Sequence, residues 1–219
     1  MSADSGLATF RDSGGLWEGF DIHEVASVDG WRRNPVKILE FYNNRRKQAL
    51  NAQPNKGHFA VATLEEQFRV TVITQNVDDL HERSGSSRVI HLHGELCKAR
   101  SVRNSKLVKY IGPEPIHMGD TAEDGAQLRP HIVWFGESVP LLEEAMGIME
   151  TARILIVIGT SLVVYPAAGL IDYVPAGIPR YLIDPSEPGR YLTGDWQHLK
   201  TTAAKGTPEL VTNLFKLDE

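Results

Sequence analysis

The near-continuous apolar run ARILIVIG, residues 152–159, restricts the fold more than any other feature of the chain. A strand that is apolar on both faces has to be covered on both faces, which is typical of a central strand in a parallel sheet. Three more β-rich runs, at residues 68–74, 88–93 and 179–184, alternate with helical patterns. We therefore expect an α/β protein with a Rossmann-like, mostly parallel sheet.

The helical patterns lie at residues 34–51, 58–68, 141–152 and 207–217. In the last of these, Thr207 is the expected N-cap and Pro208 the first helical residue. Residues 98–130 break the alternation, because they are polar, contain glycine and proline at intervals and show no clear period. We interpret them as a loop-rich inserted lobe, with lobe segments at approximately 20–57 and 97–130.

Charge and cysteine content limit the classes of partner. The 219 residues carry a net charge of -5, with no basic tract or basic-aromatic stripe, so we expect no nucleic-acid partner. No apolar run approaches the roughly 20 residues of a membrane helix, and residues 1–15 lack the pattern of a signal peptide. A single cysteine excludes an intramolecular disulfide framework and a four-cysteine zinc site. We expect a cytoplasmic protein without a membrane partner.

Polar residues follow two of the expected strands. Gly159, Thr160 and Ser161 come after the central run, and Gln75, Asn76 and Asp78 come after residues 68–74. Ligands of open α/β sheets bind at the carboxyl ends of the strands, so both groups are candidate ligand contacts. The alternatives are a strand-to-helix turn with a Ser/Thr cap at the first site and an ordinary helix start at the second.

The stretch RVIHLHGELCKARS, residues 88–101, holds two histidines and the only cysteine. His91 and His93 are expected on one face of a strand, because side chains repeat every two residues. His93 lies at the exit of the strand, where an imidazole can accept a proton near neutral pH. His91 lies further inside, and for it a hydrogen-bonded core position is the favoured interpretation.

Five segments together resemble the sirtuin family of NAD-dependent protein-lysine deacylases: SADSGLATFRDSGGLW, TQNVDDLHERSG, IHLHGEL, RPHIVWFGE and GTSLVVYPAAG. They match the family in identity, order and spacing, from residue 2 to about residue 208. The resemblance implies one sirtuin-type domain over residues 1–219, closest to the branch that removes acidic acyl groups. It also implies that NAD and an acyl-lysine protein give nicotinamide, free lysine and O-acyl-ADP-ribose.

Site residues follow from the resemblance by position. His93 matches the catalytic base, and Asn76 and Asp78 are the other catalytic residues implied. The positions implied to bind NAD are Ala3, Phe10, Arg11, Gln75, Asn76, Asp78, Gly159, Thr160, Ser161, Asp184 and Ala203. Taken without the resemblance, Arg11 is better interpreted as a surface loop residue than as a residue that pairs with a diphosphate. Asp184 replaces the usual asparagine near the adenine ribose and cannot donate a hydrogen bond when ionised.

Substrate contacts are implied in two places. Tyr42 and Arg45 lie three residues apart on one helical face and match the pair that clamps the distal carboxylate of succinyl- or malonyl-lysine. The alternative is a core tyrosine and a solvated arginine. Within VWFGE, the residues Val133, Phe135, Gly136 and Glu137 match the strand that pairs with the substrate backbone.

The chain departs from the family in the inserted lobe. Ser101 and Asn104 stand where the family has its first pair of zinc cysteines, the second pair is missing, and Cys97 falls at an apolar position. We therefore predict no structural zinc and no metal ligand.

The second departure concerns the start. Met1 stands directly after the position of a Gly-Ala-Gly turn and its preceding strand. We favour a misassigned start, since the chain as written should expose the edges of neighbouring strands and bind NAD more weakly. Two alternative functions stay open: a catalytically impaired protein that binds NAD or acyl-lysine, and a mono-ADP-ribosyltransferase. Release of nicotinamide that requires acyl-lysine would separate a deacylase from both.

Overall fold

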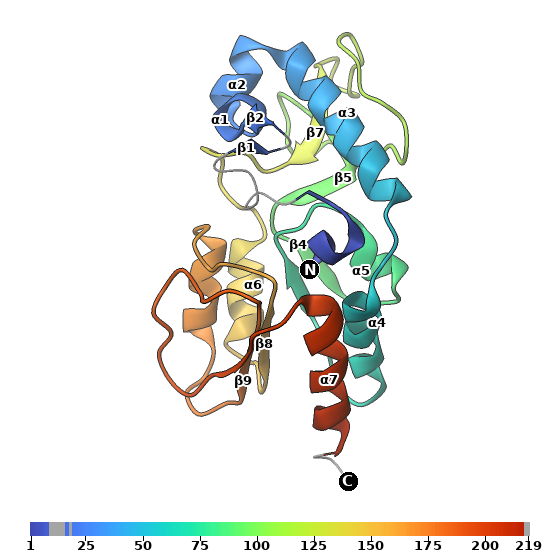
Figure 1. Ribbon diagram of the computed structural model, residues 1–219. Helices are drawn as coiled ribbons and strands as arrows, with labels where there is room; N and C mark the ends of the chain where they lie inside the picture. Colours follow the sequence, from blue (N-terminus) through green and yellow to red (C-terminus); the bar gives the residue numbers. More distant parts are fainter. Residues whose placement is uncertain (9–15, 18, 217–219) are drawn as a thin grey trace.

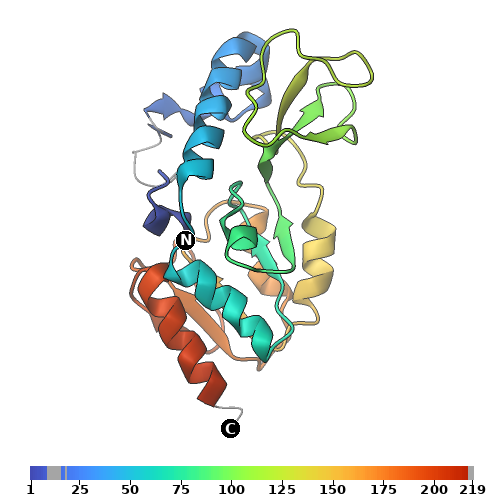
Figure 2. The ribbon, with the colours of Figure 1, turned by 90° about the vertical axis from the view of Figure 1, so that its right-hand side faces the viewer.

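The computed structural model describes residues 1–8, 16–17 and 19–216, and Figures 1 and 2 show it from two sides. An α/β domain occupies the lower part of Figure 1, and a smaller lobe of helices and strands lies above it. The amino terminus lies near the middle of the molecule, between these two parts, whereas the carboxyl terminus lies at the far end of the α/β domain.

The parallel sheet of the α/β domain consists of two pieces. In one piece, β8 (Leu155–Ile158), β9 (Arg180–Ile183) and β10 (Gln197–Leu199) pair in the order β10-β9-β8. In the other, β3 (Val72–Thr74) pairs with β4 (Val89–His91). Among the described residues no strand pairs with the remaining edge of β3 or β8. The expected parallel strands are present, but the run at residues 152–159, expected as a central strand, forms β8 at one edge of its piece, where β9 is central. Strands β3 and β4 are shorter than their apolar runs.

Helices cover both faces of this divided sheet. On one face α4 (Lys56–Thr63) and α7 (Ala203–Lys216) pack together over β9, with Ala60, Tyr181 and Leu210 in the shared core. On the other face lie α6 (Leu142–Met149) and the 3-10 helix η3 (Ala167–Tyr173). Their core contains residues of both β4 and β8, so side chains join the two pieces of the sheet. The short helices are η1 (Ser2–Ser5), η2 (Leu64–Glu66) and α5 (Leu80–Arg83).

Helix α7 begins earlier than predicted. It starts at Ala203, so Thr207 is not its N-cap and Pro208 lies inside the helix. The first turn is stabilised by residues outside the predicted segment: Thr202 O accepts from the Gly206 N–H (2.9 Å), and Asp4 Oδ2 accepts from the Ala204 N–H (2.8 Å). Pro208 has no N–H to donate to the preceding turn, yet the helix continues through it.

The small lobe combines three helices with antiparallel strands. The helices are α1 (Ile22–Val25), α2 (Val28–Arg33) and α3 (Pro35–Asn51), and a short β1 (Leu16–Trp17) pairs with β2 (Phe20–Asp21). A second sheet has the order β6-β5-β7, formed by β5 (Gly94–Ser101), β6 (Val108–Tyr110) and β7 (Leu128–Ile132). Residues 98–130 contain the end of β5, all of β6 and the start of β7, and turns and loops make up the rest, so the segment is loop-rich as expected but contributes to three strands.

Buried polar residues explain why these strands escaped the sequence pattern. Arg100, Ser101 and Arg129 are all buried on β5 and β7, so burial there does not follow apolar character. The apolar core beneath them is small and is completed by Leu39 from α3. A short strand with charged residues facing inward shows no alternation of apolar and polar residues.

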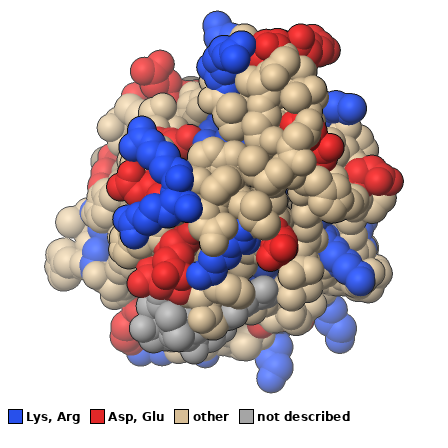
Figure 3. All heavy atoms as spheres, turned by 90° about the horizontal axis from the view of Figure 1, so that it is seen from above, with Lys and Arg blue, Asp and Glu red and all other residues tan. Residues whose placement is uncertain are grey.

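Two surface properties bear on possible partners. None of the helices that the structure describes is both long and apolar enough to cross a bilayer. On the face seen in Figure 3, lysine and arginine side chains are interspersed with aspartate and glutamate.

Candidate functional site

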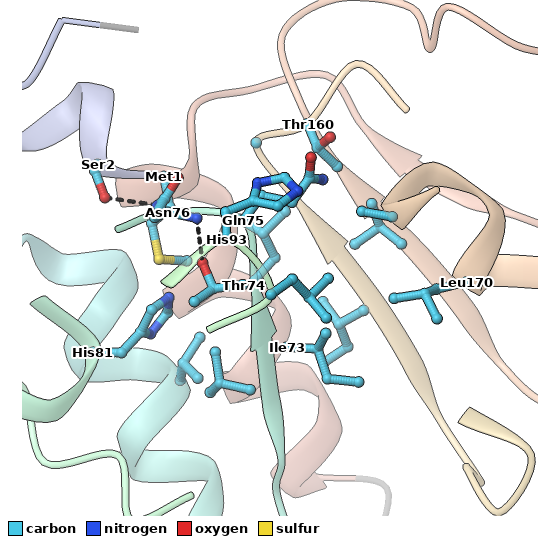
Figure 4. A pocket seen from close by; sticks show the side chains of 18 of the residues that line it. Met1, Ser2, Ile73, Thr74, Gln75, Asn76, His81, His93, Thr160 and Leu170 are labelled. Atoms are coloured by element: carbon cyan, nitrogen blue, oxygen red, sulfur yellow. Dashed lines mark hydrogen bonds between the residues drawn. The ribbon is translucent and has the colours of Figure 1, made fainter. Parts of the chain in front are cut away.

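A cavity of about 1620 Å³ lies between the α/β domain and the small lobe and extends between β3 and β8. Every candidate site residue that the structure describes lines it: Ala3, Tyr42, Arg45, Gln75, Asn76, Asp78, His93, Val133, Phe135, Gly136, Glu137, Gly159, Thr160, Ser161, Asp184 and Ala203. Phe10 and Arg11 lie outside the described residues. Residues far apart in the sequence are thus brought to one cavity, which Figure 4 shows from close by.

At the end of β3, Asn76 and Asp78 both form hydrogen bonds with the hydroxyl group of Ser2. Asn76 Nδ2 donates to Ser2 Oγ (2.8 Å), and the Asn76 N–H donates to Thr74 Oγ1 (3.0 Å), as the dashed lines in Figure 4 show. Ser2 also hydrogen-bonds the carboxyl group of Asp78. Burial raises the pKa of Asp78, opposed by the hydrogen bonds from Ser2 and the Leu80 N–H. Ser2 was not singled out from the sequence, because its partners are far away along the chain.

His91 and His93 do not share a strand. Strand β4 ends at His91, and His93 lies in the turn that leads to β5, so the prediction that both lie on one strand face was wrong. Gly94 explains the turn: its φ is +82°, and a Cβ at this position would lie 2.0 Å from His131 O. Only glycine fits such a conformation so close to backbone.

The two imidazoles differ in their environment. His91 is buried, with Nδ1 3.0 Å from Asn76 O and Nε2 2.7 Å from Glu82 Oε1. Burial alone would lower the pKa of His91, but the hydrogen bonds to Glu82 and Asn76 outweigh it and raise the pKa. His93 is half-buried on the cavity wall, and burial lowers its pKa despite a hydrogen bond with the Gln75 backbone. His93 is therefore the neutral imidazole at pH 7.

At the end of β8 the backbone itself forms the cavity wall. Gly159 has a φ of +62°, and a Cβ there would lie 2.4 Å from the Met1 amino nitrogen. Thr160 Oγ1 accepts from the Leu162 N–H (3.3 Å). At the end of the neighbouring β9, the buried Asp184 accepts from the Ser186 N–H through Oδ1 (2.9 Å). Hydroxyl, carboxylate and bare backbone groups thus face the cavity at the carboxyl ends of adjacent parallel strands.

On the lobe side, α3 presents Tyr42 and Arg45 to the same cavity. The helix begins with an Asn34 cap and Pro35, which places Tyr42 and Arg45 on its buried face. Tyr42 is completely buried, and its hydroxyl accepts from Trp134 Nε1 (3.0 Å). Burial raises the pKa of Tyr42 further above its ordinary value. Arg45 is only 5% exposed and donates to Gln48 Oε1 (3.3 Å) and Ala8 O (3.4 Å).

Residues 133–137 were expected as a strand, but β7 ends at Ile132 and these residues run into a tight turn. Gly136 has a φ of +90°, and the Glu137 N–H donates to Trp134 O (3.0 Å). The Val133 and Phe135 N–H groups donate to His93 O and Ala26 O, both at 2.9 Å. The segment is thereby tied to His93 and to the end of α1.

The positions of the first zinc cysteine pair hold a hydrogen-bonded network. Ser101 Oγ donates to Asp124 Oδ2 (2.8 Å) and accepts from the N–H groups of Arg103 (3.0 Å) and Asn104 (3.2 Å). Arg103 Nη1 donates to Asp124 O (3.1 Å). Among the described residues no group of three or more His, Cys, Asp or Glu side chains is arranged to hold a metal ion.

Comparison with known proteins gives consistent relatives. Residues 1–166 match the Sir2 family. An NAD-dependent protein deacylase of Bacteroides thetaiotaomicron is 52% identical over 215 residues, 96% of this chain and 92% of that protein. One of Helicobacter pylori is 51% identical, over 99% of this chain and 92% of that protein. The crystal structure of a Sir2 homologue in complex with NAD is 38% identical and has a TM-score of 0.88, covering 100% of this chain and 87% of that chain.

The family match spans most of the chain, the two relatives are about half identical to it, and the fold of a Sir2 homologue superimposes on it throughout. The chain belongs to the Sir2 family.

Proposed function

We propose that the chain is an NAD-dependent protein-lysine deacylase that prefers acidic acyl groups such as succinyl and malonyl. One observation carries the proposal: a single cavity contains the polar groups at the strand ends, the neutral His93, and the buried pair Tyr42 and Arg45. The names of the relatives and the NAD bound to a related structure support the reaction class.

The residues at the strand ends fit NAD. Asp184 offers a carboxylate to ribose hydroxyls, Thr160 and Ser161 offer hydroxyls, and Gly159 lines the cavity without a side chain. When bound, NAD supplies the ADP-ribose group that accepts the acyl group, and nicotinamide is released.

His93 is the proposed general base. Its lowered pKa keeps the ring unprotonated at neutral pH, so a ring nitrogen is able to accept a proton from a ribose hydroxyl. Asn76 is held by Ser2 and Thr74, and Asp78 by Ser2, so both side chains are oriented before a ligand binds. Gln75 lines the cavity beside them.

The acyl preference rests on Tyr42 and Arg45. A guanidinium binds a carboxylate through two parallel charge-assisted hydrogen bonds, and a phenol hydroxyl adds a third. Since Arg45 is buried in the cavity wall, its charge is poorly solvated and a carboxylate is favoured beside it. Succinyl and malonyl groups carry such a carboxylate and acetyl does not. Val133, Phe135, Gly136 and Glu137 are proposed to contact the substrate peptide.

The test compares succinyl-lysine and acetyl-lysine peptides, with nicotinamide release as the readout. We expect Arg45→Met to lower kcat/KM for the succinyl peptide by about tenfold to a hundredfold, because charge-assisted hydrogen bonds are lost. Deacetylation should change far less. The matched control is Lys47→Met, which removes one positive charge from an exposed position on the same helix. Equal loss with both peptides would sink the acyl preference, and label from NAD retained on protein would favour an ADP-ribosyltransferase.

A further inference from the structure

We infer that Trp134 is a positioning residue for acyl specificity, and that it fixes the direction in which the Tyr42 hydroxyl donates its proton. The inference rests on the proposed deacylase function and deepens it. Trp134 is 2% exposed, and its Nε1 lies 3.0 Å from the hydroxyl oxygen of Tyr42. Nothing in the local sequence pattern marks Trp134, since Tyr42 is 92 residues away.

The indole N–H of Trp134 determines the direction in which the Tyr42 hydroxyl can donate its proton. An indole N–H only donates, so the Tyr42 oxygen has to accept from Trp134. The single proton of the Tyr42 hydroxyl therefore has to go to some other acceptor. An ionised carboxylate only accepts, so a succinyl or malonyl carboxylate at Arg45 is complementary to a phenol oriented in this way. An acetyl group lacks this acceptor.

Trp134 is itself held by a buried ion-pair network. The Glu137 carboxylate accepts from Arg129 Nη1 (2.7 Å), Arg100 Nη2 (3.0 Å) and the Trp134 backbone N–H (2.9 Å). The Arg129 guanidinium also lies over the Trp134 ring, 3.3 Å from its centroid, and Arg129 Nη2 donates to Ile132 O (2.8 Å). Backbone and ring of Trp134 are thus fixed at the same time.

The network also sets the charge around the acyl end of the cavity. Arg100 and Arg129 are both buried, and they share one carboxylate, that of Glu137. The cluster of Arg100, Arg129 and Glu137 therefore carries a net positive charge on the Trp134 side of Tyr42. Arg45, about one turn further along α3, adds a second positive charge. These positive charges favour an anionic acyl group. Trp134 connects the charged cluster to the Tyr42 hydroxyl, which is proposed to contact the acyl group.

The experiment is a double-mutant cycle on kcat/KM for succinyl- and acetyl-lysine peptides. Trp134→Phe keeps an aromatic ring but removes the N–H, and Tyr42→Phe removes the hydroxyl. We expect Trp134→Phe to lower desuccinylation about fivefold, mainly through KM, with deacetylation nearly unchanged. If Trp134 acts through Tyr42, the double variant should lose no more than Tyr42→Phe alone. Trp31→Phe is the matched control, since Trp31 packs against Trp134 with ring centroids 5.5 Å apart.

The outcomes separate the two proposals. If Tyr42→Phe and Arg45→Met are selective for the succinyl peptide but the Trp134 effect is additive or equal for both peptides, the positioning role is overturned and the proposed function stands. If neither Tyr42→Phe nor Arg45→Met is selective, the acyl preference fails, and the role of Trp134 fails with it.

A second measurement uses the unmodified chain, in case Trp134→Phe does not fold. The indole N–H resonance of Trp134 should shift when a succinyl-lysine peptide binds, because hydrogen bonds in a chain polarise one another. An acetyl-lysine peptide should leave it nearly unchanged. An equal response to both peptides would overturn the inference.

Discussion

At His91 both ring nitrogens face hydrogen-bond acceptors, the backbone oxygen of Asn76 and the carboxylate of Glu82. A ring that donates from both nitrogens is an imidazolium, and it has no nitrogen left to accept a proton. This agrees with the raised pKa of His91. His93, two residues further along, has a lowered pKa and faces the cavity. Hydrogen bonding therefore supports the proposal that His93, and not His91, is the base.

The pH dependence of kcat/KM should distinguish the two histidines. With His93 as base, activity should stay level as pH falls toward the ordinary histidine value of about 6.5, and decline only below it. A decline that begins above about 6.5 would instead point to His91, whose pKa is raised. The measurement is a rate profile between pH 5 and pH 8 with one peptide at saturating NAD.

The sequence predicts the residues of this site that follow strands, but not those that depend on contacts between distant parts of the chain. The ends of parallel strands converge, so Gln75, Asn76 and Gly159 were predictable as neighbours. Ser2 was not, since its hydrogen bond to Asn76 spans 74 residues and no local pattern reports it. The turn at Gly94 was missed as well, because its close approach to His131 O is a tertiary contact.

Among the elements, the antiparallel sheet of the small lobe is held at one end by hydrogen bonds around Ser101. Ser101, at the end of β5, accepts hydrogen bonds from the backbone N–H groups of Arg103 and Asn104 and donates one to the Asp124 carboxylate. The hydrogen bond from Ser101 is the main reason that the pKa of Asp124 is lowered. A lowered carboxyl pKa means that this contribution is present above the unfolded-state pKa and is lost as pH falls through the folded value.

Ser101→Ala should loosen this end of the lobe without affecting the α/β domain. The Arg103 and Asn104 amides lose their acceptor, so their hydrogen exchange should become about tenfold faster. Ser105→Ala, in the exposed part of the same loop, is the control and should change little. Stoichiometric zinc in chelator-washed protein would contradict the idea that hydrogen bonds stabilise this end.

Elements formed by local patterns were predicted well, whereas elements stabilised from a distance were not. Helix α3 was expected at residues 34–51 and is observed at Pro35–Asn51, because its cap and its apolar spacing are local. Helix α7 begins four residues before Thr207, since Asp4, 200 residues away, accepts from the Ala204 N–H. Strands β5 and β7 bury arginines paired with Glu137, which conceals their alternation.

For the molecule as a whole, two buried histidines link α4 to α5. The rings of His58 and His81 lie 5.0 Å apart, and His58 Nδ1 accepts from the Asn55 N–H at the start of α4 (3.2 Å). Burial lowers the pKa of His58 to about 3 and that of His81 to about 4. Both rings are therefore neutral in the folded protein at pH 7 and become charged more readily in the unfolded chain.

This difference predicts acid sensitivity. Because both folded pKa values lie below the unfolded one, the stabilisation is complete above about pH 6.5 and is lost as pH falls toward 4. His91 acts in the opposite direction, since its raised pKa contributes stability that is lost as pH rises. Together these two histidines should lower the free energy of unfolding by about 4 kcal/mol between pH 7 and pH 5, and His91 offsets part of this loss.

Urea denaturation at several pH values measures this dependence. In the double variant His58→Gln, His81→Gln, the free energy of unfolding should differ less between pH 5 and pH 7 than in the unmodified protein. This expectation does not depend on how stable the variant is at pH 7. A slope that is unchanged in this variant would show that other groups cause the acid sensitivity.

The divided sheet has a consequence for how stability is distributed. Pairing across a continuous sheet would couple all its strands through one ladder of backbone hydrogen bonds, but in the described chain the ladder of β8, β9 and β10 does not reach β3 and β4. Side-chain packing, including the core between β4, β8 and α6, connects the two pieces. We therefore expect the contacts of this side-chain core, rather than an interstrand ladder, to carry the coupling between the two pieces.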